Sequence, residues 1–168
     1  MRTTVSMIAL TAAMLSAENL VLNGGFELGM QGYETLRMLR QDKNKDLQFI
    51  DAVIDTSDTD GSGQSILLKN PYAERTELWG HEFLLKAKTT YTVSFSCKAS
   101  IEDYPVEATI LSVDAQWINY GKSFTAGRTW KRLSHTFTTD GTDRYCSIFL
   151  RCTPKDDTAA DVRFDSIM

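Results

Sequence analysis

Two segments of this chain alternate apolar and polar residues with a period of two, and this pattern constrains the fold more than any other feature. Residues 90–98 read Thr-Tyr-Thr-Val-Ser-Phe-Ser-Cys-Lys, and residues 145–152 read Tyr-Cys-Ser-Ile-Phe-Leu-Arg-Cys. Both are rich in β-branched and aromatic residues, and a period of two directs alternate side chains to opposite faces of a strand. The two segments are therefore predicted to be β-strands with one face in a core.

Similar stretches predict further strands, and turn-forming residues separate them. The predicted strands cover residues 48–54, 64–69, 77–85, 107–117, 131–139 and 162–167. Turn signals such as Asn23-Gly24 and Asp140-Gly141 lie between them. Residues 34–46 could form a short helix, and a long surface loop is an equally good interpretation. Strands at these intervals favour an all-β fold, a two-sheet antiparallel β-sandwich.

The first 17 residues have the composition of a secretory signal peptide. Arg2 supplies a positive charge, residues 5–15 are apolar and uncharged, and Ser16-Ala17 offers small residues for cleavage. The apolar stretch is shorter than the roughly 20 residues that span a bilayer. We expect a secreted domain over residues 18–168, extracellular or periplasmic, with no membrane span in the mature chain. A buried N-terminal helix is the alternative interpretation.

Charge and cysteine content exclude other classes of protein. The chain has 18 Lys and Arg against 22 Asp and Glu, without a basic run. Binding to a phosphate backbone needs clustered positive charge, so we expect no nucleic-acid partner. Its three cysteines, Cys97, Cys146 and Cys152, are an odd number and include no CxxC pair. They allow at most one disulfide, which would involve Cys97, and buried thiols are the preferred interpretation.

Several short motifs follow one another in a recognisable order. They are residues 19–27 (Asn-Leu-Val-Leu-Asn-Gly-Gly-Phe-Glu), Gly32-Tyr33, residues 85–95, residues 130–138 and residues 164–167. In this order they resemble the jelly-roll carbohydrate-binding modules of families four, nine, sixteen and twenty-two, within the galactose-binding-like superfamily. Tyr33 stands where these modules usually have tryptophan, and Ala87-Lys88 stands where they usually have Pro-Gly.

This resemblance implies a jelly roll of the galactose-binding-like type and a function in binding. Such a module adsorbs to polysaccharide or oligosaccharide and targets an attached carbohydrate-active enzyme to its substrate. The chain could then be the N-terminal part of a longer protein with a glycoside hydrolase domain. No Gly-x-Ser-x-Gly, HExxH or phosphate-binding glycine motif occurs, so we expect the domain itself to be non-catalytic. The alternative is a structural or protein-contacting jelly roll without a glycan site.

The resemblance also implies a structural calcium ion that links the two ends of the domain. The matching ligands are the carboxylates of Glu27 and Asp165, with the carbonyl of Gly25 as a third. Ca²⁺ prefers six to eight hard oxygen ligands, so a carboxylate from each end suits it. The alternative is that both are ordinary solvated carboxylates. The acidic stretch at residues 58–63 lacks the EF-hand ligand spacing and is interpreted as a turn.

Sugar binding needs aromatic faces for the C–H surface of a pyranose and planar polar groups for its hydroxyls. Residues 114–120 offer both just before Gly121, with the candidates Gln116, Trp117, Asn119 and Tyr120. In a continuous strand Trp117 would share the inward face with Leu111, so burial is the alternative.

A second candidate group consists of Arg75 and Trp79, with Tyr72 nearby. Trp79 has the parity of Phe83, which favours burial in the core. Trp130 is not a candidate for sugar binding. It is expected to pack inside the structure, because it matches a structural tryptophan of the modules that the chain resembles.

Overall fold

The computed structural model describes residues 19–36, 52–69, 76–114, 116–154 and 158–168, and the side chains of residues 34–36 are not among those described. Within these ranges the chain forms ten β-strands and no helix. In chain order they are β1 (Tyr33–Leu36), β2 (Ala52–Asp55), β3 (Ser65–Leu68), β4 (Thr76–Leu85), β5 (Thr90–Ala99), β6 (Tyr104–Ser112), β7 (Lys122–Ala126), β8 (Lys131–Thr138), β9 (Arg144–Cys152) and β10 (Val162–Asp165).

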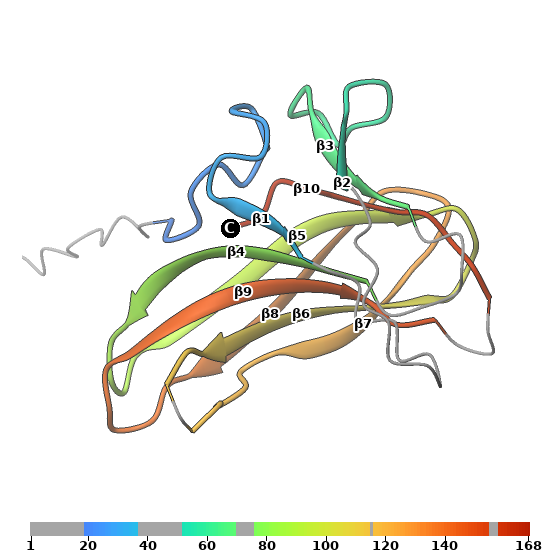
Figure 1. The fold of residues 1–168 in the computed structure, drawn as a ribbon. Coiled ribbons are helices and arrows are strands. Elements are labelled where there is room, and N and C mark those ends of the chain that lie inside the picture. Colours follow the sequence, from blue (N-terminus) through green and yellow to red (C-terminus); the bar gives the residue numbers. More distant parts are fainter. Residues whose placement is uncertain (1–18, 37–51, 70–75, 115, 155–157) are drawn as a thin grey trace, which may run out of the picture.

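The strands form two five-stranded antiparallel sheets, which Figure 1 shows stacked as two layers. The first sheet has the order β1-β4-β9-β6-β7, and the second sheet has the order β2-β3-β10-β5-β8. The closing strand β10 lies between β3 and β5, so the end of the chain completes the middle of the second sheet. The predicted fold class, a two-sheet antiparallel β-sandwich, is confirmed.

The core lies between the two sheets and follows the predicted alternation. Phe95 and Phe164 of the second sheet face Ile148 and Leu150 of the first, and all four are buried. The three cysteines are also buried and are free thiols, as the preferred interpretation expected. Desolvation raises the pKa of the Cys97 thiol to about 12, which keeps it protonated and apolar in character.

The ends of several strands differ from the prediction. β6 ends at Ser112, five residues before the predicted end at residue 117, because the chain turns into a loop there. The short edge strands β1 and β7 were not predicted. β7 is mostly exposed over its five positions, and the interpretation of residues 34–46 as a short helix or a surface loop is wrong for residues 34–36, which belong to β1. The predicted start of β2 and most of residues 34–46 lie outside the described residues.

The N-terminal segment is fixed to the end of the chain. The N–H of Ile167 donates to the carbonyl of Gly24 at 2.8 Å, and Figure 1 shows the C-terminus beside this segment. A Cβ on residue 24 would lie 1.9 Å from the Ile167 carbonyl oxygen, so only glycine allows the approach. The Asn-Gly-Gly-Phe motif is therefore built around this contact.

Polar contacts also hold the loop at residues 56–63 against the second sheet. Asp58 accepts hydrogen bonds from Lys98 Nζ at 2.7 Å and from Trp130 Nε1 at 2.9 Å. Trp130 is half-buried, which agrees with the packing role predicted for it. Within the described residues no helix has the length and hydropathy to span a membrane.

Stability is expected to fall in acid, in part through Asp55. Hydrogen bonds from the hydroxyl and N–H of Ser57, and from Arg163 Nε at 2.8 Å, lower the pKa of Asp55 to about 2 from 3.8. Because the folded-state pKa lies below the unfolded one, Asp55 stabilises the fold above about pH 4, and this contribution disappears as the pH falls toward 2. Thermal melts at pH 7, 4, 3 and 2 measure the loss, and Asp55→Asn should decline less over this range. An equal decline in Asp55→Asn would contradict this assignment.

Candidate functional site

A β-bulge reverses the facing of β4 and brings Trp79 to the outer face of the first sheet. Trp79 pairs with Phe149 and Glu82 pairs with Ser147, so Gly80 and His81 together oppose a single residue of β9. Trp79 therefore faces outward although Phe83, at the same parity, faces the core. The parity argument for burial of Trp79 is wrong for this reason, and Trp79 is half-buried.

Contacts below Trp79 hold its indole in place. The indole packs edge-on against Phe149 with ring centres 4.6 Å apart, and its Nε1 donates to Glu77 Oε2 at 3.2 Å. The Arg151 guanidinium lies over the Phe149 ring, and its Nε is 3.1 Å from Glu77 Oε1. Phe149 is only 3% exposed, so it supports Trp79 and offers no open face of its own. Trp79 is thus a fixed aromatic surface.

A depression of about 410 Å³ lies beside Trp79, over the bulge. Its wall contains two aromatic residues, a carboxylate, an imidazole and a serine hydroxyl. The lining residues are Gly32, Tyr33, Trp79, Gly80, His81, Glu82 and Ser147. His81 Nε2 is 3.2 Å from the carbonyl oxygen of Leu20 and so donates to it, which leaves Nδ1 as an acceptor. This buried Nδ1 has no hydrogen-bond partner within the described residues. The volume falls in the usual range for ligand sites, roughly 300 to 1,000 Å³.

The loop after β6 presents Trp117 to solvent. It closes where the N–H of Ile118 donates to Ser112 Oγ at 2.8 Å, and Trp117 has a φ of 51° and is 62% exposed. Because β6 has already ended, Trp117 escapes the inward position that a continuous strand would give it. Tyr120 instead is half-buried and stacks on Phe137 at 5.1 Å.

Two other predicted ligand residues, Gln116 and Asn119, form hydrogen bonds within the protein. Gln116 directs its Oε1 to Arg144 Nη2 at 2.8 Å, and the exposed Asn119 accepts from the N–H of Gly121 at 2.7 Å. Both lie on the Trp117 loop, whereas Trp79 lies on β4 of the same sheet. Arg75 and Tyr72 lie outside the described residues.

Sequence reasoning missed Tyr145, which is 60% exposed on the outer face of the first sheet. Its carbonyl accepts from the N–H of Val113 at 3.0 Å, so it lies next to the start of the Trp117 loop. Tyr145 shares its face with Phe149, four residues away, or about 13 Å at the usual rise of a strand. The alternation of residues 145–152 contained this signal, because Tyr145, Ser147, Phe149 and Arg151 share one parity.

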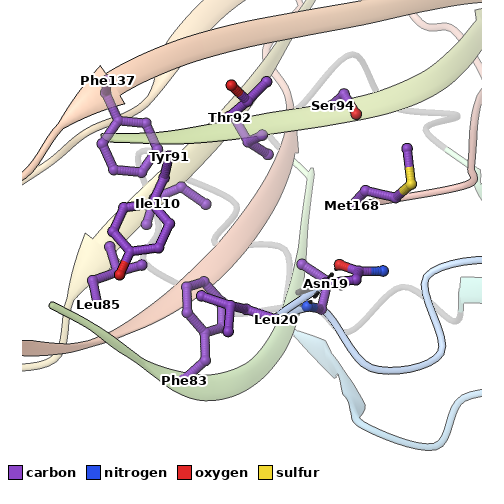
Figure 2. A pocket seen from close by; sticks show the side chains of 12 residues that line it. Asn19, Leu20, Phe83, Leu85, Tyr91, Thr92, Ser94, Ile110, Phe137 and Met168 are labelled. Carbon is purple, nitrogen blue, oxygen red and sulfur yellow. Dashed lines mark hydrogen bonds between the residues drawn. The ribbon is translucent and has the colours of Figure 1, made fainter. Parts of the chain in front are cut away.

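A second cavity, of about 300 Å³, lies between the two sheets and differs in character. Figure 2 shows that its side chains come from both sheets, among them Phe83 and Leu85 of β4, Tyr91 of β5 and Phe137 of β8. No charged side chain lines it among the described residues, and most of the lining is apolar. A ligand rich in hydroxyl groups would lose hydrogen bonds there, so this cavity does not fit a sugar.

The predicted calcium ligands gather around the loop at residues 56–63. The buried Asp165 accepts from Ser62 Oγ at 2.6 Å and from the N–H of Asp60 at 2.8 Å. A Cβ on Gly25 would lie 3.5 Å from Ser62 Cβ, and a Cβ on Gly63 would lie 3.7 Å from Glu27 Oε1, so Gly25 and Glu27 both adjoin this loop. The donor atoms are all oxygens, which suits a hard cation. The described residues contain no group of three or more His, Cys, Asp or Glu side chains around one point, so carbonyl and hydroxyl oxygens would complete a shell.

Fold and site together define a jelly-roll β-sandwich with an aromatic, polar-edged outer face. The model of one family, the carbohydrate binding domain of families four and nine, matches residues 18–157. The chain therefore belongs to this family of carbohydrate binding domains, which are non-catalytic. No curated protein matches the sequence.

Solved structures agree with the fold. "Family 16 Carbohydrate Binding Module-2" superimposes with a TM-score of 0.65 at 18% identity, over 89% of this chain and 98% of that one. "TmCBM61 in complex with beta-1,4-galactotriose" gives 0.61 at 12% identity, over 90% and 97%. The family 11 module from Clostridium thermocellum, in complex with a beta-1,3-1,4-mixed-linked tetrasaccharide, gives 0.56 at 13% identity, over 85% and 90%.

Proposed function

We propose that this domain adsorbs to polysaccharide or oligosaccharide chains through the outer face of its first sheet. The observation that carries this proposal is the fixed indole of Trp79 beside a depression lined by His81, Glu82 and Ser147. An indole accepts the C–H surface of a pyranose, and the carboxylate, imidazole and hydroxyl groups can hydrogen-bond its hydroxyls.

Trp117 and Tyr145 extend this surface along β9. Both side chains are more than half exposed, so each offers an open aromatic face to a ligand. We therefore propose that a glycan contacts Trp79 with one unit and the Trp117 loop with another. Two modules of similar fold have structures in complex with a galactotriose and with a mixed-linked tetrasaccharide, which supports a ligand of several units.

The biological role that follows is targeting. Binding to a polymer raises the effective concentration of any domain on the same chain, so a non-catalytic module would increase the action of an attached carbohydrate-active enzyme, such as a glycoside hydrolase, on that polymer. The composition of residues 1–17 supports secretion. Fusing the domain to an unrelated glycoside hydrolase tests targeting. Hydrolysis of an insoluble polymer should rise, while hydrolysis of a soluble oligosaccharide should not change.

Affinity electrophoresis tests glycan binding against the structural alternative. The panel consists of β-glucans, xylans, mannans and uronic polymers. Retardation in at least one polymer, weakened by Trp117→Ala, supports binding. Migration that no polymer retards supports a structural or protein-contacting domain instead, and release of soluble product from the same panel would reveal an enzyme.

We also propose a structural calcium ion held by Glu27, Asp165 and the Gly25 carbonyl. Such an ion would join the N-terminal segment to the closing strand and stabilise the fold without contacting the glycan. Removing it with a chelator should lower the Tm by roughly 5–10 °C, since saturation at about a hundred times Kd contributes about 2.7 kcal/mol. The readout is a thermal melt with chelator and after calcium is restored.

Glu27→Gln tests the calcium site by removing one ligand charge. Because Glu27 is exposed, this replacement disturbs little packing. The variant should melt at a lower temperature and respond less to chelator. Asp165→Ala should abolish the response, at a larger cost in stability because Asp165 is buried and hydrogen-bonded. A Tm of the unmodified protein that chelator does not change would refute the calcium site.

A further inference from the structure

Arg144 forms hydrogen bonds and ion pairs with three side chains close to the proposed glycan surface. It is 8% exposed at the start of β9, and its guanidinium is held by side chains from two separate loops. Asp140 of the turn before β9 binds Nη2 at 2.9 Å and Nε at 3.2 Å. Gln116 of the Trp117 loop accepts from Nη2 at 2.8 Å, and Asp114 of the same loop forms an ion pair with Nη1. One guanidinium thus joins both loops.

These contacts hold Asp114 and Gln116, which lie shortly before Trp117. The Asp114 carboxylate also accepts from Ser112 Oγ at 2.9 Å and from the N–H of Gln116 at 3.0 Å. Trp117 follows with a φ of 51°, a backbone conformation that bulky L-residues rarely adopt. Such a conformation persists where the surroundings determine it strongly, and it concentrates at binding sites. Here Asp114 and Gln116, which both bind Arg144, hold the backbone of Trp117 in this conformation.

We infer that Arg144 is a positioning residue, which holds the Trp117 indole in the orientation that contacts the glycan. The inference rests on the proposed function and adds a residue that does not itself touch the ligand. A preorganised loop loses less conformational freedom on binding, so the arrangement increases affinity. Only arginine supplies the planar fork of donors that these partners require, because a lysine ammonium cannot bind Asp140 and Gln116 in the same geometry.

The electrostatics agree with this arrangement. The hydrogen bond from Arg144 is the main reason that the pKa of Asp140 lies below its usual value. The Ser112 hydroxyl is the main cause for the lowered pKa of Asp114, and Arg144 adds to it. Both carboxylates are therefore charged at neutral pH, and each pairs with the cation. The nearby ion pair of Lys86 and Asp143 is well exposed, at 2.9 Å, and among the described residues of the Trp117 loop none bonds to it.

A double-mutant cycle separates positioning from general stability. Arg144→Lys keeps the charge and should weaken binding to the best-retained polysaccharide about three- to tenfold, the order expected when a contact residue loses its preorganisation. In the Trp117→Ala background the same change should alter affinity less than twofold, because no indole remains to position. Lys86→Ala is the matched control at the same end of the sheet and should leave affinity unchanged in both backgrounds.

Limited chymotrypsin digestion of the sugar-free protein gives a readout that does not depend on a ligand. Cleavage after Trp117, followed by mass spectrometry, should be several-fold faster in Arg144→Lys than in the unmodified protein or in Lys86→Ala. Equal cleavage in all three proteins overturns the inference. So does an equal loss of affinity from Arg144→Lys with and without Trp117, since that pattern indicates a role in stability alone.

The outcomes also distinguish this inference from the proposed function. If Trp117→Ala does not alter binding while Trp79→Ala abolishes it, glycan binding stands and the positioning role of Arg144 is refuted. If no polysaccharide retards the unmodified protein, both are refuted together.

Discussion

Replacing Trp79 with alanine is expected to weaken binding to the best-retained polysaccharide at least thirtyfold. The indole is the largest fixed aromatic surface beside the depression, and truncation of a central tryptophan in an interface typically costs about 2 kcal/mol or more. Its edge contact with Phe149 and its hydrogen bond to Glu77 already fix its orientation, so little entropy is lost when a ligand binds. Affinity electrophoresis over a series of polymer concentrations measures the change.

Trp130→Phe is the matched control for Trp79→Ala. Trp130 bonds Asp58 against the second sheet, on the opposite side of the sandwich. This variant should lose some thermal stability and keep its affinity within twofold. Equal losses of affinity in the two variants would contradict a binding surface on the first sheet and would point to a general effect on folding.

Replacing Phe95 with alanine should lower the free energy of unfolding by about 3–5 kcal/mol, the usual range for deleting a buried phenylalanine ring. Phe95 is fully buried, and its ring lies 5.4 Å from that of Phe124 and 5.9 Å from that of Phe164, so the substitution leaves a cavity between the sheets. Urea denaturation followed by circular dichroism measures the change.

Tyr145→Ala is the counterpart of Phe95→Ala on the surface. Because Tyr145 is exposed, its loss should change the unfolding free energy by less than about 0.5 kcal/mol and should weaken glycan binding. Phe95→Ala should show the reverse, with affinity unchanged at temperatures where the variant remains folded. A stability loss in Tyr145→Ala as large as that in Phe95→Ala would mean that the outer face is part of the core.

Much of the fold could be predicted because its causes are local. The alternation in residues 90–98 and 145–152 corresponds to β5 and β9, since period-two burial leaves a direct trace in sequence. Edge strands such as β7 are half exposed and short, so their residues carry little of that pattern. The strand order, with β10 between β3 and β5, depends on pairings between distant segments that alternation alone does not encode.

The candidate site was less predictable because its geometry depends on local irregularities. Trp117 was a candidate from its residue type and its place before Gly121, and Trp79 from its residue type and its polar neighbours, but the parity rule favoured an inward position for each. A bulge at Gly80 and an early end of β6 overrule that rule, and one residue gained or lost in register turns a side chain to the other face. Arg144 was not a candidate, because its contacts with Asp114 and Gln116 of the Trp117 loop join residues 30 and 28 positions apart.

The most direct test of glycan binding through the first sheet is a map of backbone amide shifts during titration. The probe is an oligosaccharide cut from the polymer that retards the domain most. We predict shifts at Trp79 and Glu82, along residues 145–149 and in the loop around Trp117, with the outer face of the second sheet unchanged. Shifts that cluster around Lys98 and Arg163 of the second sheet, or no shifts with any oligosaccharide of the panel, would contradict it.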